Sequence, residues 1–394
     1  MKLAHLADVH LGFRQFHRLN AAGINQREAD VARAFRTAID GVIAAAPDLV
    51  VIAGDLFHSV RPTNTAILDA FHQFQRLRAA VPPAPIVMVA GNHDTPRSVE
   101  TGSILRLFEA VGNVHVVVAG PTELAFPALD LTVMCVPYAA WGGSVAPTLL
   151  PTSGATHRVA VTHGAVRGTF PEPAWAEDFG PHLEPGDLHA EQWSYLALGH
   201  YHVAHRVRDN AWYAGALEYT SPNVWGELRD EEREGREGKG WLLVELREQT
   251  PRVVFNPVAP ARRLIDLPPI AGAGLGPAEL DGLVAEAVDT IPGGLDGHIV
   301  RQIVFDVPRP ISRDLNYAGI RNYKTRALHY HLDIRRPAPT RSVGVGGPGE
   351  RQTLRQLVAD FVERRPLDAE VSRSELVALA GQYMDEVNRD EDRA

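Results

Sequence analysis

The chain has 394 residues, enough for two or three domains, and a hydrophobic fraction of 45%, ordinary for a soluble globular protein. Its formal net charge of −9 argues against passive binding to a polyanion. Cys135 is the sole cysteine, which excludes an intrachain disulfide. The start does not resemble a signal peptide, and no apolar run reaches the roughly 18 residues of a membrane span, so we expect a soluble, cytoplasmic protein without membrane contact.

The first half alternates predicted strands and helices. Apolar runs predict strands at 2–7, 48–53 and 86–90, and helical periodicity predicts helices at 27–46 and 63–80. This order favours a mainly parallel sheet with helices on its faces. Later strand-like runs have few helices between them and predict a second, more antiparallel sheet: 114–118, 131–136, 159–162, 195–198 and 241–246. We therefore expect an α/β fold, a four-layer helix–sheet–sheet–helix sandwich over residues 1–256.

Near residue 257 the pattern changes to a small α+β unit, expected to span 257–336. Strand-like runs at 263–267, 299–307 and 328–334 flank a helix-like run at 277–291. A Pro/Gly-rich tether at 337–349 reads as a linker, and a helical hairpin is expected over 350–394.

The first tail helix carries an apolar stripe at helical spacing, made of Leu354, Leu357, Val358, Phe361 and Val362. The run Ser372–Glu375 is a plausible capping box for the second helix. An apolar stripe beyond a flexible linker usually marks an interface, so we expect it to bind a partner. The alternative is that both helices pack on the large domain.

The segment 309–341 is basic within an acidic chain. It holds eight arginines and lysines against Asp314 and Asp333, together with three tyrosines. It therefore offers candidate contacts for a nucleic acid such as DNA at Arg321, Lys324 and Arg326. In the first half of the chain, Arg61 is a further candidate contact. A solvated surface without a ligand explains the same charges equally well.

Five short patches, most of them at the end of a predicted strand, carry metal-binding residue types. They are Asp8–His10, Gly54-Asp55, Gly91–Asp94, Thr162–Gly164 and Gly199–His202. A turn or a polar residue at the end of a strand would explain each patch taken alone. The carboxyl ends of neighbouring strands, however, meet at one edge of a sheet. Together they predict a dinuclear metal site bridged by Asp55, with these candidate ligands: Asp8, His10, Asp55, Asn92, His163, His200 and His202. Hard oxygens with imidazoles suit manganese, iron or zinc, and paired metals suit phosphoester hydrolysis.

His93 directly follows Asn92 and should face elsewhere while staying near the metals. That position suits a general acid, or a group that stabilises charge in the transition state. His58 is a second candidate, for a phosphate contact, although a plain loop residue is an equally good reading. Apart from His58, the histidines outside the five patches are expected to be surface or packing residues.

These motifs resemble the calcineurin-like metallophosphoesterases, and more narrowly the nuclease subunit of double-strand-break repair complexes, called SbcD in bacteria. The run from Gly54 to Pro62 is the most specific element, and the resemblance covers 1–256 by motif and 257–394 by layout. It implies that Asp8, His10, Asp55 and His202 hold one metal, and that Asp55, Asn92, His163 and His200 hold the other. It further implies two Mn²⁺ ions, a catalytic His93, and a His58 that aids phosphate binding.

The resemblance also implies biological context. It makes 1–256 a nuclease domain, exonuclease or endonuclease, acting on DNA in repair, recombination and replication. It makes 257–336 a capping domain that shapes the DNA site, and 350–394 a hairpin that grips the coiled coil of an SbcC-like ATPase; a homodimer is expected by analogy. The chain departs from the family pattern at Gly215–Glu218, because relatives often carry Gly-Ser there. The alternatives are an enzyme for small phosphoesters and a scaffold that has lost catalysis, although a scaffold should lack ligands.

Overall fold

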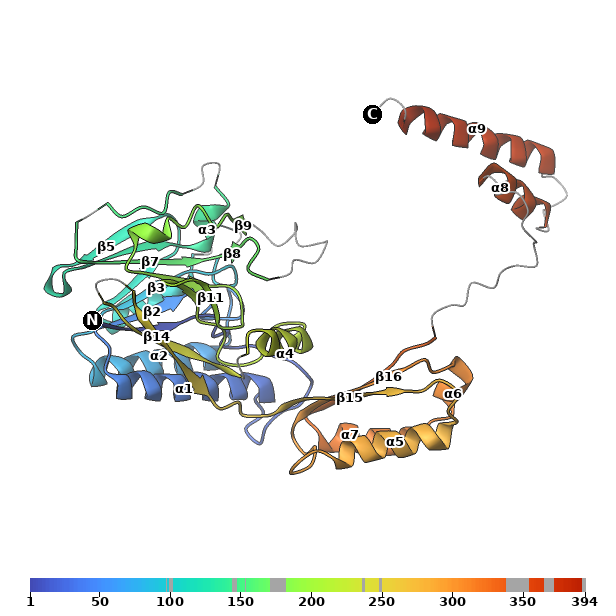
Figure 1. The fold of residues 1–394 in the computed structure, drawn as a ribbon, viewed down its shortest axis with the longest axis horizontal. Coiled ribbons are helices and arrows are strands. Elements are labelled where there is room, and N and C mark those ends of the chain that lie inside the picture. The colour runs from blue at the N-terminus through green and yellow to red at the C-terminus, as the bar shows by residue number, and fades with distance from the viewer. Residues whose placement is uncertain are drawn as a thin grey trace. The chain divides into compact units, whose positions relative to one another are not determined.

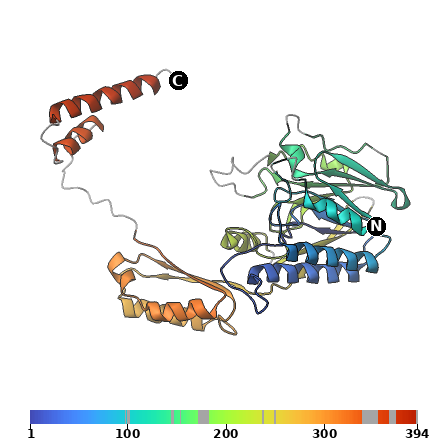
Figure 2. The same ribbon diagram turned by 180° about the vertical axis from the view of Figure 1, so that it is seen from behind.

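The computed structural model describes residues 1–96, 98, 102–143, 147–152, 154–170, 182–235, 238–247, 250–337, 354–364 and 372–391. It forms two compact units, Met1–Arg336 and Pro337–Ala394 (Figures 1 and 2). Apart from Pro337, the predicted linker lies outside the described residues.

The first sheet has the strand order β14-β13-β1-β2-β3-β4. Its parallel strands are β1 (Lys2–Leu6), β2 (Leu49–Ala53), β3 (Ile86–Val89) and β4 (Val114–Val117). The antiparallel strands β13 (Lys239–Glu245) and β14 (Arg252–Val258) extend it beyond β1. The predicted domain boundary at residue 256 therefore falls inside β14.

Helices α1 (Gln26–Ala45) and α2 (Asn64–Ala80) cover the outer face of this sheet (Figure 1). Asn25 and Thr63 cap their first turns with side-chain oxygens. The apolar stripe of α1, which includes Val31, Phe35 and Ile39, is fully buried against the sheet. A 3₁₀ helix, η2 (Ile104–Val111), packs beside α2.

The second sheet has the order β11-β12-β10-β7-β6-β5. Its strands are β5 (Thr122–Phe126), β6 (Leu131–Val136), β7 (His157–His163), β10 (Tyr195–Gly199), β11 (His205–Arg208) and β12 (Ala211–Tyr213). The expectation of a more antiparallel sheet was wrong, because β6, β7, β10 and β12 run parallel. The described parts of the crossovers between them hold only short elements, and the sequence carries no helical signal there. The predicted strands 114–118 and 241–246 also belong to the first sheet, as β4 and β13.

The two sheets pack face to face through apolar side chains such as Val51, Val87, Val133 and Val161. The outer face of the second sheet is covered by α3 (Tyr138–Trp141), η5 (Ala190–Gln192), the strand pair β8 (Ala165–Val166) and β9 (His182–Leu183), and loops. The α/β sandwich prediction is therefore confirmed, with a fourth layer that contains little helix in its described part. The remaining helix of this part, α4 (Val224–Arg233), was not predicted.

The small α+β unit contains a parallel sheet of β15 (Leu264–Ala271), β16 (Ile299–Phe305) and β17 (His329–Ile334). Helices α5 (Pro277–Asp289), α6 (Arg309–Arg313) and α7 (Tyr317–Arg326) accompany it. Its own apolar core includes Leu280, Val300 and Tyr330. The unit thus has an interior separate from those of the large sandwich.

In the second compact unit, α8 (Leu354–Glu363) packs against α9 (Arg373–Glu391). Of the predicted stripe, Val362 is buried and Val358 is partly buried, whereas Leu357 and Phe361 are 51% and 58% exposed. The side chain of Leu354 lies outside the described residues. Among the helices in the described ranges, none has the length and apolarity needed to cross a lipid bilayer.

Candidate metal centre

The candidate ligands follow the carboxyl ends of strands from both sheets. Asp8 and His10 follow β1, Asp55 follows β2, and Asn92 follows β3. His163 ends β7, and β10 pairs with β7 in the register Gly199↔His163, which places His200 and His202 beside it. The loops after β1 and β2 run side by side, because Asp8 N and His10 N donate to the carbonyls of Gly54 and Asp55 at 3.1 and 3.0 Å. All the candidates therefore meet at one edge.

The backbone is unusual at four candidate ligands. Asp8, His10 and Asp55 have φ angles of 51°, 53° and 52°, and His200 has 123°. Residues other than glycine rarely adopt positive φ, and such conformations cluster at functional sites where surrounding structure holds them. These turns direct the side chains into the common centre.

Three glycines allow the strands and ligands to approach each other. A Cβ at Gly54 would lie 2.2 Å from Nδ1 of His163, and one at Gly91 would lie 2.2 Å from Oδ1 of Asp55. A Cβ at Gly199 would lie 1.8 Å from the carbonyl oxygen of Ala53. The glycines of the sequence patches thus have a steric reason to stand where they do.

Asp55 lies in the middle of the cluster and is buried. Its Oδ1 accepts a hydrogen bond from the backbone N of His93 at 2.8 Å. Its Oδ2 lies 3.4 Å from Nε2 of His163 and 3.8 Å from Nε2 of His10. One carboxylate oxygen therefore faces imidazoles of both halves of the cluster, which is the placement a bridging ligand needs.

On one side of Asp55, two ring nitrogens face each other. Nε2 of His10 and Nε2 of His202 are 3.1 Å apart, with the carboxylate of Asp8 close to both rings. With the Asp8 carboxylate beside them, the two ring nitrogens lie close enough together to bind one shared cation. Asp8, His10 and His202 each offer one ligand atom, and these three atoms all lie within 4.8 Å of one another.

On the other side, His163 and Asn92 converge. Nδ1 of His163 donates to the carbonyl of Ala53 at 2.9 Å, so its Nε2 is left to face Oδ1 of Asn92 at 3.0 Å. Nδ1 of His200 lies 3.3 Å from the same oxygen. The hydrogen bond to Ala53 fixes the ring tautomer in the way that metal-bound histidines usually require.

The charge balance of the cluster also suits a cation. Burial would raise the pKa of Asp55, but the charge of His163 and its hydrogen bond hold that pKa well below its usual range. Burial would lower the pKa of His163, yet the charge of Asp55 outweighs burial and raises it to about 9. A proton on His163 therefore supplies part of the positive charge that a divalent ion would bring, and binding of the ion would release it.

The residues present fit two divalent metals. The described residues contain three overlapping groups able to hold an ion: His10 with His58 and His93, Asp8 with His10 and His202, and Asp8 with Asp55 and His163. Carboxylate, amide and imidazole donors without thiolate are the donor types that suit divalent ions such as manganese, iron or zinc.

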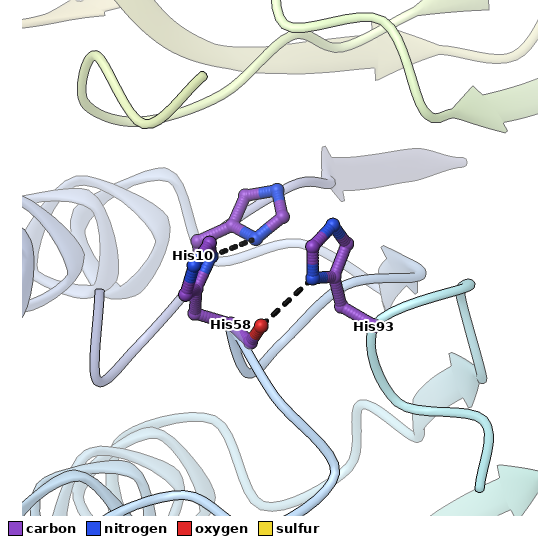
Figure 3. Close-up of side chains that lie close together, drawn as sticks. All are labelled: His10, His58 and His93. Carbon is purple, nitrogen blue, oxygen red and sulfur yellow. Dashed lines mark hydrogen bonds between the residues drawn. The ribbon is translucent and has the colours of Figure 1, made fainter. Parts of the chain in front are cut away.

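His93 and His58 lie beside His10, one of the candidate ligands (Figure 3). Nδ1 of His93 donates to the backbone carbonyl of His58 at 2.7 Å, which leaves its Nε2 available to another group. The rings of His93 and His10 are 4.8 Å apart, and Nδ1 of His58 is 3.4 Å from Nδ1 of His10. Burial, and then the charge of His93, lowers the pKa of His58 to about 4, so His58 is neutral at pH 7.

The predicted DNA contacts divide into two groups. Arg61 lines a hollow of about 420 Å³ together with His58, Asn92 and His93, so it adjoins the cluster. Arg321, Lys324 and Arg326 lie on α7 of the small α+β unit and are exposed. Arg326 is engaged by Asp296 in a bidentate ion pair with distances of 3.0 and 2.7 Å.

Three residues that support the cluster were missed in the sequence. Asp94 accepts hydrogen bonds from the backbone N atoms of Leu56, Phe57 and Gly91 at 3.1 to 3.2 Å and so ties two ligand loops together. Glu227 contacts His202, and Lys239 contacts Glu227. Asp94 belongs to the predicted patch Gly91–Asp94, where it was given no role, whereas no motif marked Glu227 or Lys239.

Comparison with known proteins agrees with this geometry. A family model described as calcineurin-like phosphoesterase matches residues 1–215. A protein named DNA double-strand break repair protein Mre11 from Methanopyrus kandleri is 29% identical over 262 residues, which cover 62% of this chain and 54% of that protein. The protein of that name from Saccharolobus solfataricus is 25% identical over 274 residues, covering 64% of this chain and 62% of that protein.

The matched regions span 24% to 62% of the lengths of these and similar curated relatives. A solved dimetal phosphatase from Danio rerio aligns with 66% of this chain and 99% of its own, at 13% identity and a TM-score of 0.36. That score is too low for an argument from its fold.

Proposed function

Because the chain belongs to the calcineurin-like phosphoesterase family, we propose that it is a manganese-dependent DNA nuclease of double-strand-break repair. The observation that carries this proposal is the convergence of seven ligand-type side chains in a chain whose curated relatives are double-strand-break repair proteins. A metal-dependent phosphoesterase needs such a cluster, and none of the expected ligands is missing. A scaffold without catalysis would not have kept them.

We assign Asp8, His10, Asp55 and His202 to one ion, and Asp55, Asn92, His163 and His200 to the other. The support is the position of the Asp55 carboxylate between His163 and His10 and the shared orientation of the remaining donors. Two ions bound there would activate a water molecule and draw charge from the phosphate. Mn²⁺ suits this mixture of oxygen and imidazole donors.

The chain's own residues then handle the proton and the phosphate. His93 has its Nδ1 held by a carbonyl, so Nε2 is the atom that would give a proton to the leaving oxygen. Neutral His58, next to it, would contact the phosphate through its ring.

We propose DNA as the substrate and 257–336 as a capping domain that borders it. Arg61 in the hollow beside His93 would contact the backbone nearest the scissile bond, and Arg321, Lys324 and Arg326 would contact it farther away. Phosphate contacts of this kind contribute affinity without base recognition. A protein that repairs chromosomal DNA must share its compartment, so we propose a cytoplasmic location.

We propose that the hairpin 350–394, beyond the linker 337–349, binds the coiled coil of an SbcC-like ATPase. Leu357 and Phe361 of α8, with Tyr383 of α9, present exposed apolar surface. Helix-on-helix docking is the simplest way to cover such a surface. A homodimer is proposed as well, and the exposed Leu68 on α2 and Leu107 on η2 offer apolar surface for it.

The test is hydrolysis by the purified full chain with Mn²⁺ or Mg²⁺. Labelled duplex and single-stranded DNA are compared with a generic small phosphodiester. We expect DNA to be cut in Mn²⁺ and Asp55→Asn to lower the rate by orders of magnitude, because the bridging charge is lost. Efficient turnover of the small phosphodiester with intact DNA would replace the nuclease by an enzyme for small phosphoesters.

A further inference from the structure

Helix α4 buries a face made of charged residues. Glu227 and Glu231, one turn apart, both contact Nζ of Lys239 on β13. Oε1 of Glu231 lies 2.8 Å from that Nζ. The Lys239 side chain is 1% exposed. Buried charges of this kind are retained only when each is paired, and removing one partner is costly. Lys239 therefore fixes α4 against the first sheet.

The second oxygen of Glu227 reaches a candidate metal ligand. Its Oε1 lies 3.3 Å from Nδ1 of His202 and accepts a hydrogen bond from Ser221 N at 2.8 Å. Lys239 Nζ also donates to the carbonyl of His202 at 2.9 Å. With Nδ1 directed at the carboxylate, Nε2 of His202 faces His10 and the centre of the cluster. This is the carboxylate–histidine arrangement found behind metal-bound imidazoles.

The same helix touches the small α+β unit. The guanidinium of Arg301 on β16 lies 4.5 Å from the ring centroid of Trp225, two residues before Glu227. Asp266 on β15 holds Arg301 through a bidentate ion pair. Trp225 and Glu227 thus link that unit and His202 through less than one turn of helix.

A second set of ion pairs and hydrogen bonds runs between the same regions. Arg27 of α1 contacts Asp30 at 3.2 Å and the carbonyl of Tyr219 at 2.8 Å. Asp30 also accepts from Arg262, whose guanidinium donates to the carbonyl of Gly297 at 2.7 Å. The Tyr219 hydroxyl in turn donates to Glu231 at 2.8 Å. The contact through Trp225 is therefore reinforced from the opposite end of α4.

We propose that α4 is a positioning element: Glu227 orients His202 for metal binding, and the contact of Arg301 with Trp225 steadies that orientation from the small α+β unit. The inference rests on the metal role proposed above for His202. Loss of the carboxylate partner of a metal-bound histidine typically lowers metal affinity by about 10- to 100-fold. A purely structural Glu227, present only to neutralise Lys239, would leave the affinity unchanged.

Glu231 provides the matched control, because it pairs with the same lysine but does not contact His202. Metal-free full-length protein is titrated calorimetrically with Mn²⁺ as wild type, Glu227→Gln and Glu231→Gln. We expect both variants to lose thermal stability, and only Glu227→Gln to bind one of its two ions about 10- to 100-fold more weakly. Activity of that variant should recover at high Mn²⁺. Equal Mn²⁺ affinities in the two variants would overturn the inference.

Two further arms complete the test. If Glu227→Gln does not fold, the double variant Glu227→Gln/Lys239→Met takes its place, because it also removes the buried charge of Lys239. Its control is the double variant Glu231→Gln/Lys239→Met. Trp225→Ala should weaken Mn²⁺ binding by between about 2- and 30-fold, the usual range for coupling through packed elements. Arg229→Ala, on the exposed side of α4, should not. Wild-type affinity in Trp225→Ala would refute the link to the small unit. A wild type that binds no Mn²⁺ would instead refute the proposed function.

Discussion

Replacing Gly91 by alanine adds one methyl group against the centre of the cluster. The new Cβ would lie 2.2 Å from Oδ1, 2.7 Å from Cγ and 2.6 Å from the backbone N of Asp55. Gly91 does not have positive φ, so alanine meets no backbone strain there. Any effect of Gly91→Ala must therefore act through displacement of Asp55.

The size of that displacement follows from the distances. Non-bonded heavy atoms settle at about 3.5 Å or more, so the carboxylate must move by roughly 1 Å. Overpacking of this kind typically costs about 1–3 kcal/mol of stability. A misplacement of about 1 Å in a catalytic constellation can lower the rate about 100-fold. We expect Gly91→Ala to fold, to bind less metal, and to lose at least that factor in phosphodiester hydrolysis.

The assay measures metal content by elemental analysis, melting temperature by calorimetry, and hydrolysis rate on one preparation. Gly120→Ala is the matched control, because a Cβ there meets no atom within 4 Å and the residue has no positive φ. A Gly91→Ala protein with two bound ions and the wild-type rate would refute the central role given to Asp55.

His93→Ala should keep its metal content and lose turnover by about 100-fold or more, since His93 is assigned proton transfer; loss of metal in parallel would make it a ligand. Burial lowers the pKa of His5 to about 3, so between pH 6.5 and 3 the unfolded chain binds more protons than the folded protein. The free energy of unfolding should therefore decrease as the pH is lowered through that window. His5→Gln should flatten that fall in calorimetric melts; an unchanged slope would contradict it. Truncation after Gly349 should preserve melting temperature and basal hydrolysis while abolishing association with an SbcC-like ATPase; a collapsed melting temperature would place the hairpin in the core.

The convergence of the candidate ligands was predictable because its signal is local. Each patch ends a short apolar run, and the carboxyl ends of neighbouring strands share an edge. The return of β13 to the first sheet was not predictable in this way. Its pairing with β1 joins Lys2 to Glu245, and nothing in either strand alone specifies that partner. The parallel second sheet was missed for a related reason, because the described parts of its crossovers hold no long helix.

Helix α4 was missed because its buried face is charged. The helix turns Glu227 and Glu231 inward, so a search for apolar periodicity finds nothing there. Those carboxylates are buried only because Lys239, which follows α4 on β13, arrives to neutralise them. A helix whose burial depends on an ion pair is specified by two separate segments of the chain. Neither segment alone carries a sequence pattern that predicts it.

The position of β1 between β2 and β13 has a consequence for synthesis on the ribosome. The first strand of the chain keeps one edge unpaired until residues 239–245 have emerged, and the last candidate ligand, His202, emerges shortly before them. Until residue 202 has been made, a nascent chain therefore holds Asp8 and His10 without His202, the third member of their group. The candidate metal site can be complete only after His202 has been made, and the first sheet only after β14 has followed β13.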